Sequence, residues 1–307
     1  MEKPLVSAII TTHNRCGLLI RAIDAAISQT YHPMEIIVVD DASTDDTCEA
    51  CKKYGDQINY IQIPPQKSRG GNYARNLGIR SARGEYVAFC DDDDYWLPQK
   101  TEKQMRLMLS GDYELVHCGR TLEYVGKHTA KQKDIIPSSD KYGDMSRKIL
   151  LTICATTTTT ILAKREALLD VGLFDESLGF WQEYELTIRL AQRKPFGSVL
   201  ETLCVYRVDT TDKNRLTNKY FSWRKAVKYI HEKHAKLYRQ LNWYERLHVK
   251  RLIHGDAKMR AKSSRLHLFY CYHFFMNTIC RIILKAVKLC RCIPHFKRDY
   301  AQFASGN

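Results

Sequence analysis

Apolar and polar positions alternate in blocks along the first ninety residues, and each block has the length of one strand or one helix. Residues 6–11 (VSAIIT) form an apolar, β-branched run that is too short for a helix and suits a buried strand. Residues 16–29 then carry apolar side chains at helical spacing. The alternation continues as strand 35–39, helix 45–54, strand 58–63, helix 72–82 and strand 85–90. This order predicts an α/β fold with a doubly wound, mainly parallel sheet.

The pattern changes after this first part of the chain. Residues 112–207 mix strand and helix signals with longer loops, which suits an α+β half of the same domain. Within it we expect a strand at 156–163, a helix at 182–191 and a further strand within 196–207. Beyond residue 209 the pattern is almost entirely helical. We therefore predict a first domain at 1–210 and a helical C-terminal extension at 211–307.

Charge is distributed unevenly over the 307 residues. The net charge of +14 would suggest a nucleic-acid partner if it were spread over the whole chain. Residues 211–307, however, hold 22 Lys and Arg against 5 Asp and Glu, whereas residues 1–210 hold 26 against 29. The basic character therefore belongs to the C-terminal extension, and the first domain is close to neutral.

The start of the chain and its cysteines both favour the cytosol. Residues 1–4 lead directly into an apolar strand without a secretory leader, so we expect a cytosolic N-terminus. Eleven scattered cysteines do not form the dense framework of a small secreted domain and favour reduced thiols. Cys48 and Cys51 make a C-x-x-C without a second pair at zinc-ligand spacing, so we interpret them as neighbours on a helix turn.

Polar side chains follow three predicted strands directly, at the edge where an open α/β sheet binds ligands. These are residues 11–15 (TTHNR), 40–43 (DDAS) and 91–94 (DDDD). Four consecutive carboxylates repel one another unless a cation lies between them. Magnesium or manganese takes such oxygen ligands and keeps only one or two carboxylates when substrate phosphates supply the rest. The alternative for an acidic run alone is a solvated loop that caps the next helix.

Residues 67–72 (KSRGGN) add a basic, glycine-containing segment to this picture. With two acidic strand ends it predicts a pocket of mixed charge, which is what a nucleotide, its metal and its phosphates need. No G-x-G-x-x-G follows the first strand, and no G-x-x-x-x-G-K-[ST] occurs. Dinucleotide-dependent dehydrogenases and P-loop enzymes are therefore disfavoured.

Seven blocks stand in order along roughly residues 4–210: VSAIITTHNR (6–15), SQTY (28–31), EIIVVDDASTDDT (35–47), GGNYARNLGI (70–79), GEYVAFCDDDD (84–94), VGLFDES (171–177) and WQEYELTIRL (181–190). They resemble the successive blocks of family 2 glycosyltransferases with the GT-A fold. The resemblance implies a nucleotide-sugar-binding half at 1–118 and an acceptor half at 119–210. It also implies an inverting enzyme that moves one sugar from a nucleotide-diphosphate sugar, by default a UDP-sugar, to an acceptor hydroxyl.

The resemblance also assigns roles to individual residues. The residues expected to contact the nucleotide are Thr11, His13, Arg15, Asp41, Asn72, Arg75 and Asp92. Among them Asp41 reads the base and Asp92 lies near the ribose. The D-x-D pattern falls on Asp91 and Asp93, with Asp93 as the direct ligand of a divalent cation, Mn or Mg.

The catalytic base of similar enzymes falls on Glu183, where most relatives carry Asp. Such a carboxylate takes the proton of the acceptor hydroxyl as it attacks, while the divalent ion stabilises the diphosphate leaving group. Glu185 lies around the opposite side of the same predicted helix and suits this role less well. The alternative for Glu183 is an ordinary first-turn acid stabilised by the helix dipole.

Residues 266–293 begin as an apolar, aromatic stretch and end as a basic amphipathic helix. The charge-free part, 266–280, is shorter than the roughly 20 residues that a spanning helix needs. We expect this segment to lie on an anionic membrane surface, and the alternative is a helix packed on the catalytic domain. The membrane interpretation favours a lipid-linked or surface-polysaccharide glycan as acceptor, as in bacterial polysaccharide assembly. It places the enzyme on the inner face of the cytoplasmic membrane.

Processive family members carry a Q-x-x-R-W block and several spanning helices, and this sequence shows neither, so transfer of a single sugar is favoured. One competing hypothesis is a nucleotidyltransferase of nucleotide-sugar metabolism, which would carry a glycine-rich loop after the first strand. Another is a non-catalytic basic protein that binds nucleic acid or membrane through its tail. That hypothesis leaves the clustered acids unexplained, and we expect no nucleic-acid partner.

Overall fold

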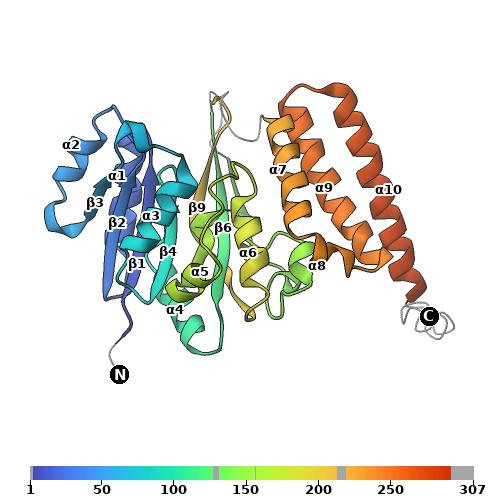
Figure 1. Cartoon of the computed structure of the whole chain (residues 1–307), viewed down its shortest axis with the longest axis horizontal. Helices are drawn as coiled ribbons and strands as arrows, with labels where there is room; N and C mark the ends of the chain where they lie inside the picture. The colour runs from blue at the N-terminus through green and yellow to red at the C-terminus, as the bar shows by residue number, and fades with distance from the viewer. Residues whose placement is uncertain (1–2, 127–130, 156, 213–218, 292–307) are drawn as a thin grey trace. The chain divides into compact units, whose positions relative to one another are not determined.

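The computed structural model describes residues 3–126, 131–155, 157–212 and 219–291. The chain divides into two units, each with its own packing (Figure 1). The first contains the residues up to Asp212 except Leu150–Thr152. The second contains Leu150–Thr152 together with the C-terminal helices.

The first unit is built on a nine-stranded sheet of order β3-β2-β1-β4-β8-β6-β9-β5, with β7 paired to β6. Its N-terminal half is parallel and consists of β1 (Val6–Thr12), β2 (Met34–Asp40), β3 (Asn59–Gln62) and β4 (Tyr86–Asp91). The other half is mixed and consists of β5 (Tyr95–Trp96), β6 (Leu115–Val125), β7 (Lys131–Ile135), β8 (Ile161–Lys164) and β9 (Phe196–Asp209). There β6 runs parallel to β9, while β8 is antiparallel to β4 and β6. The predicted α/β class with a doubly wound sheet is confirmed.

Helices connect the strands of this unit. They are α1 (Cys16–Ile27), α2 (Thr47–Lys52), α3 (Gly71–Ser81), α4 (Lys100–Leu109), α5 (Arg165–Asp170) and α6 (Gln182–Leu190). Short 3-10 turns lie at Gly55–Gln57, Pro65–Lys67, Ser139–Lys141, Lys148–Leu150 and Thr158–Thr160.

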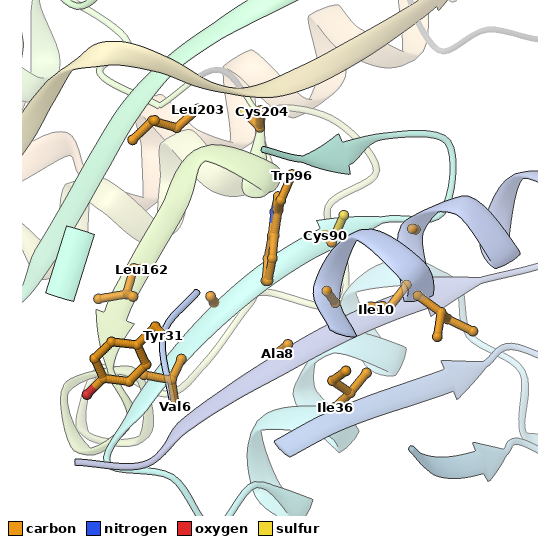
Figure 2. Packing of buried hydrophobic residues seen from close by; sticks show 14 of the residues in the cluster. Val6, Ala8, Ile10, Tyr31, Ile36, Cys90, Trp96, Leu162, Leu203 and Cys204 are labelled. Carbon is orange, nitrogen blue, oxygen red and sulfur yellow. The ribbon is translucent and has the colours of Figure 1, made fainter. Parts of the chain in front are cut away.

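The alternation of side chains along β1 explains why helices cover both faces of the sheet. Val6, Ala8 and Ile10 belong to one buried cluster with the apolar side of α1, as the close-up of this core shows (Figure 2). Ile9 points to the opposite face, against α3. A Cβ atom on Gly78 would lie 2.6 Å from Ile9 Cγ2, so the glycine allows α3 to approach the sheet closely.

The strand expected at 156–163 is only partly correct. Strand β8 begins at Ile161, and Thr158–Thr160 form a 3-10 turn. The Thr157 hydroxyl accepts from Thr159 N, and the Thr160 hydroxyl donates to Thr157 O. Threonine hydroxyls satisfy the backbone locally here, which competes with strand pairing despite the β-branched composition.

The second unit is helical, with α7 (Tyr220–Lys233), α8 (Ala235–Arg239), α9 (Trp243–Ser263) and α10 (His267–Arg291). Asn242 and Glu245 form a capping box that begins α9. Helix α10 packs along α9 through a buried line of four residues, His273, Asn277, Cys280 and Leu284. Asn277 Nδ2 donates to Arg251 O of α9 at 2.8 Å.

The face of α10 opposite this buried line is apolar and exposed. Leu268, Phe275, Ile282 and Leu289 are 87%, 63%, 62% and 60% exposed. The basic residues Arg281, Lys285 and Lys288 are also exposed and lie on one flank of this face. Among the described residues, no helix combines the length and hydropathy that crossing a bilayer requires. Residues 292 and 293 of the predicted membrane segment lie outside the described residues.

One titratable group is buried in the sheet of the first unit. His117 of β6 is completely buried, and its Nε2 lies 2.8 Å from Lys141 O. Because the carbonyl can only accept, the proton resides on Nε2, and Nδ1 has no hydrogen-bond partner among the described residues. Burial lowers the pKa of His117 from 6.5 to about 4. The folded protein therefore holds a neutral imidazole throughout the physiological pH range.

We predict that this histidine makes the protein less stable in mild acid. The unfolded chain takes up a proton as the pH falls below 6.5, whereas the folded chain does not until about pH 4. The free energy of unfolding should therefore fall by about 2 kcal/mol between pH 7 and pH 5 through His117 alone. Urea unfolding at both pH values should show a smaller loss for His117→Gln than for the wild type. An equal loss in both proteins would contradict this assignment, and the exposed His32→Gln serves as the control.

Candidate active site

The carboxyl ends of β1, β2 and β4 meet at one edge of the sheet. Thr11 at the end of β1 is buried and pairs in register with Val39 of β2 and with Asp91 of β4. Strands β2 and β3 lie on one side of β1 and β4 on the other, so the winding direction changes at β1. Open α/β sheets bind ligands at such a switch point. The three polar segments predicted from the sequence are thus brought together.

The four acidic residues that follow β4 alternate between buried and accessible positions. Asp94 N donates to Asp91 O at 3.0 Å, which closes a tight turn. Asp92 and Asp94 are buried, whereas the side chains of Asp91 and Asp93 are 25% and 32% exposed. The two residues of the D-x-D pattern are therefore the two carboxylates that solvent reaches.

The buried carboxylates are held by hydrogen bonds. Asp92 accepts from Thr12 Oγ1 at 2.8 Å and from Arg15 Nη1 at 3.0 Å. Asp94 accepts from Thr159 Oγ1 at 2.6 Å and from Arg207 N at 3.1 Å. Burial raises the pKa of Asp92 to about 6, although Arg15 opposes this shift. Burial and the charges of Asp93 and Asp91 raise the pKa of Asp94 well above its usual range.

Two arginines supply positive charge to this acidic edge. Arg15 Nη1 lies 3.0 Å from both Asp92 Oδ1 and Asp93 Oδ2. Arg75 is buried on α3, and its Nη2 lies 2.6 Å from Asp91 Oδ1. Burial opposes a charge on Arg75, but Asp91, with smaller contributions from Glu183 and Asp92, raises its pKa above the ordinary value. Both guanidiniums therefore stay charged and border the acidic edge.

Asp41 contains a carboxylate oxygen without a partner. The side chain is 7% exposed, and Oδ2 accepts from Gly70 N at 2.9 Å. Oδ1 is buried and has no hydrogen-bond partner among the described residues. Leaving a buried acceptor unsatisfied costs free energy that a ligand N–H could recover. His13 is exposed, and its Nδ1 lies 2.6 Å from Asp41 O.

The loops around Asp41 adopt an unusual backbone. Asn14 and Ala42, which follow β1 and Asp41, have φ values of 53° and 63°. Positive φ is uncommon for residues other than glycine and is retained where the surrounding structure enforces it. Asn14 Oδ1 accepts from Thr44 N at 2.7 Å, which joins the two loops.

Glu183 stands on the first turn of α6, half-buried, and contributes to the electrostatic environment of Arg75. The carboxylate is therefore near enough to Arg75 to act on its pKa, although it lies about a hundred residues away in sequence. Trp181, directly before α6, has a φ of 55° and packs edge-on against Tyr184 with ring centroids 5.2 Å apart. This left-handed residue sets the direction in which α6 begins.

Side chains of helix α3 hold the loop that leads to Glu183 in place by hydrogen bonds. Asn72 Nδ2 donates to Asp175 O at 2.9 Å and to Leu178 O at 2.6 Å, and Asn72 Oδ1 accepts from Arg75 at 3.3 Å. Asn76 exchanges two hydrogen bonds with the backbone of Phe174. The amide of Asn72, which the sequence assigned to the nucleotide, is thus occupied in positioning this loop.

Glu185 has a different environment from Glu183. It is completely buried and forms a close ion pair with Arg189, at 2.6 Å between Oε2 and Nη2. Arg189 also donates to the carbonyl oxygens of Val171 and Leu173. Glu185 therefore stabilises the packing of α6 against the preceding loop.

The acidic edge fits an ion that takes most of its ligands from a substrate. Within the described parts of the chain, no three His, Cys, Asp or Glu side chains are grouped closely enough to hold a metal by themselves. Asp91 and Asp93 offer hard oxygen donors from one tight turn. Magnesium and manganese sites that contain substrate phosphates commonly use only one or two protein carboxylates. Asp91 and Asp93 provide such a pair of carboxylates.

Sequence reasoning missed several residues that shape this site. Thr158 and Thr159 bring hydroxyls to Asp91 and Asp94, at 3.0 and 2.6 Å. Arg21 donates to Asp93 O at 3.0 Å, and its guanidinium lies 4.4 Å from the centroid of the Tyr95 ring. The run of five threonines at 156–160 was the one visible signal, and its composition indicated a strand instead.

Comparison with known proteins agrees with this geometry. Residues 7–172 match the model of the family Glycosyl transferase family 2. An uncharacterized glycosyltransferase of Rickettsia typhi is 35% identical over 191 residues, which cover 60% of this chain and 57% of that protein. A UDP-Glc:alpha-D-GlcNAc-diphosphoundecaprenol beta-1,3-glucosyltransferase of Escherichia coli is 40% identical over 104 residues, covering 34% of this chain and 41% of that protein. The chain thus spans 57% and 41% of the length of these two relatives.

Solved structures show the same architecture. A mannosyltransferase of Pyrobaculum calidifontis, solved with GDP-Man and Mn²⁺, superimposes with a TM-score of 0.57 at 17% identity. The match covers 97% of this chain and 83% of that chain. At this identity the similarity concerns the fold. With the family match over more than half of its residues, the chain belongs to glycosyl transferase family 2 and has the GT-A fold.

Proposed function

We propose that this protein transfers one sugar from a UDP-sugar to an acceptor hydroxyl, with inversion at the anomeric carbon. The observation that carries the proposal is the gathering of Asp91, Asp93, Arg15 and Arg75 at the carboxyl edge of the sheet, with Glu183 near enough to contribute to the raised pKa of Arg75. A carboxylate, a buried cation and accessible aspartates are what proton transfer and diphosphate binding require. Residues 1–210 would form the catalytic domain and residues 211–307 an extension.

The nucleotide would bind over the ends of β1 and β2. The unpaired Oδ1 of Asp41 suits an N–H donor on the base, such as N3–H of uracil. Guanine also offers such a donor, and the Escherichia coli relative named for UDP-Glc favours uracil. The same edge is bordered by Thr11, His13 and Arg15. Asp92 accepts a hydrogen bond from Arg15. Asn72 would contribute to the site indirectly, because it holds in place the loop that leads to Glu183.

Asp93 and Asp91 would hold a divalent cation, manganese or magnesium, between the protein and the two phosphates. The bound ion would supply positive charge next to the diphosphate as the bond to the sugar breaks. Arg75 and Arg15 hold Asp91 and Asp93 in place through ion pairs before the donor arrives.

Glu183 would act as the general base. It would accept the proton of the acceptor hydroxyl while that oxygen attacks the anomeric carbon from the side opposite the diphosphate. A single displacement of this kind inverts the configuration.

The acceptor would be a lipid-linked or surface-polysaccharide glycan on the inner face of the cytoplasmic membrane. The exposed apolar face of α10, bordered by Arg281, Lys285 and Lys288, suits the surface of an anionic bilayer. The Escherichia coli relative is named for a diphosphoundecaprenol-linked acceptor. Nucleic acid has no part in this proposal, because the acidic edge would repel a phosphate backbone.

We predict that the purified protein with manganese slowly releases nucleoside diphosphate from one member of a panel of nucleotide-sugars, with water as acceptor. EDTA and Asp93→Ala should abolish this release, because the diphosphate charge is then uncompensated. Glu183→Gln should lower kcat by about 10²- to 10⁴-fold, because the base is lost. The rate of nucleoside diphosphate release, measured with EDTA and for each of the two variants, checks these expectations.

Glu166→Gln is the matched control, since Glu166 is an exposed first-turn acid of α5. Its rate should equal that of the wild type. Turnover that persists in Glu183→Gln would remove Glu183 from catalysis. Absence of both turnover and donor binding across the panel would refute the transferase proposal for this chain.

We predict that Phe275→Glu lowers the affinity for vesicles containing phosphatidylglycerol by about tenfold, because apolar burial is lost and a negative charge is added. Co-sedimentation at low and high salt measures this. Leu109→Glu, at an exposed apolar position of α4, should leave vesicle binding unchanged. Equal losses in the two variants would show that the face of α10 is not the contact.

A further inference from the structure

Helices α7, α9 and α10 of the C-terminal unit enclose a cavity of about 500 Å³. Pockets for small ligands range from roughly 300 to 1,000 Å³. Four aromatic rings line it, from Tyr220, Trp223, Phe269 and Tyr272, and aliphatic side chains complete the walls. The cavity therefore offers a ligand mainly apolar and aromatic contacts.

Three polar side chains of the cavity form a hydrogen-bond network. The Tyr220 hydroxyl lies 2.7 Å from His273 Nε2, and His273 Nδ1 lies 2.8 Å from His254 Nδ1. These three residues come from α7, α10 and α9, so the network holds the three helices around the cavity. Burial lowers the pKa of His273 to about 4, and that of His254 is also lowered by burial, so both rings are neutral at pH 7. A sugar would find few free hydrogen-bonding groups here.

Arg224 supplies one positive charge among the lining residues. Burial raises the pKa of Tyr220, and the charge of Arg224 opposes that shift, which places the guanidinium beside the hydroxyl. The Arg224 side chain is exposed at the same time, so it can reach an anionic group outside the apolar walls.

The cavity is continuous with the apolar face of α10. Leu268 and Tyr272 line the cavity and are 87% and 54% exposed, and Leu268 is also the first residue of the exposed face. A hydrocarbon chain could therefore pass from a bilayer surface into the cavity along apolar side chains. Apolar walls with the Arg224 cation at the rim match a hydrocarbon chain that ends in an anion.

We propose that this cavity binds a lipid phosphate with a single hydrocarbon chain, such as a prenyl phosphate, with the chain against the aromatic rings and the phosphate at Arg224. This ligand class deepens the proposed function, because a lipid-linked acceptor would carry the same group. The binding itself requires neither donor nor catalysis.

Calorimetric titration of the full chain with farnesyl phosphate, below its critical micelle concentration and without donor or divalent cation, tests this binding. We expect one molecule to bind per chain. Farnesol should bind about tenfold more weakly, because the charge-assisted contact is missing. Inorganic phosphate should show no measurable binding, because it lacks the chain.

Matched variants distinguish lipid binding in the cavity from lipid binding on the exposed face of α10. Leu268→Gln should weaken farnesyl phosphate binding by about tenfold, whereas Leu289→Gln, on the same exposed face but outside the cavity, should not. Arg224→Gln should weaken farnesyl phosphate binding by about tenfold and leave farnesol binding unchanged. Lys225→Gln, its exposed neighbour on α7, should change neither.

Equal effects of the two leucine variants, or absence of farnesyl phosphate binding, would overturn the proposal. Equal effects of Arg224→Gln and Lys225→Gln would overturn the phosphate contact. Competition by phosphatidylglycerol at the same concentration as farnesyl phosphate would overturn the single-chain class. Donor hydrolysis without lipid should be unaffected by Leu268→Gln. If the wild-type protein hydrolyses a donor but does not bind farnesyl phosphate, the cavity proposal alone is refuted. If it binds farnesyl phosphate but neither hydrolyses nor binds a donor, the transferase proposal alone is refuted.

Discussion

Four carboxylates in succession at the end of β4 impose the electrostatic constraint around which the first unit is arranged. Each needs a compensating partner, because like charges in a partly buried turn repel one another strongly. Asp92 and Asp94 obtain it from hydroxyls, a guanidinium and a backbone N–H. Asp91 obtains it from Arg75. The partners come from β1, the loop after it, α3 and the turn before β8, so the cluster draws distant segments to one edge.

Arg75 connects the aspartates after β4 with the loop that precedes α6. It is buried, pairs with Asp91 and lies 5.7 Å from the centroid of the Phe174 ring. Phe174 belongs to the loop that α3 fastens through Asn72 and Asn76, and that loop leads into α6 with Glu183. Hydrogen bonds and packed side chains thus connect the aspartates with the loop that precedes Glu183.

Apolar packing, and not charge compensation, organises the C-terminal unit. Its α10 buries one line of four residues against α9 and leaves the opposite apolar face in contact with water. An apolar face of that size usually indicates a contact surface, since exposure of so many large side chains costs solvation free energy. The cavity held open by Tyr220, His254 and His273 lies beside this face. The apolar face and the cavity are the two features on which the proposed contact with lipid depends.

Local patterns in the sequence determined the order of strands and helices over residues 6–91, the parallel first half of the sheet and the seven blocks of the family. Short-range periodicity suffices for those features, because strands such as β1 and helices such as α3 each bury one continuous apolar pattern. The residues of the edge, from Thr11 to Asp94, could be predicted because carboxyl ends of parallel strands must meet. Tertiary packing alone decided the rest. The turn at Thr158–Thr160, the engagement of the Asn72 amide, the open oxygen of Asp41 and the burial of Glu185 depend on contacts between residues that are remote in sequence. The free energy of those contacts exceeds local propensity, and no local pattern encodes it.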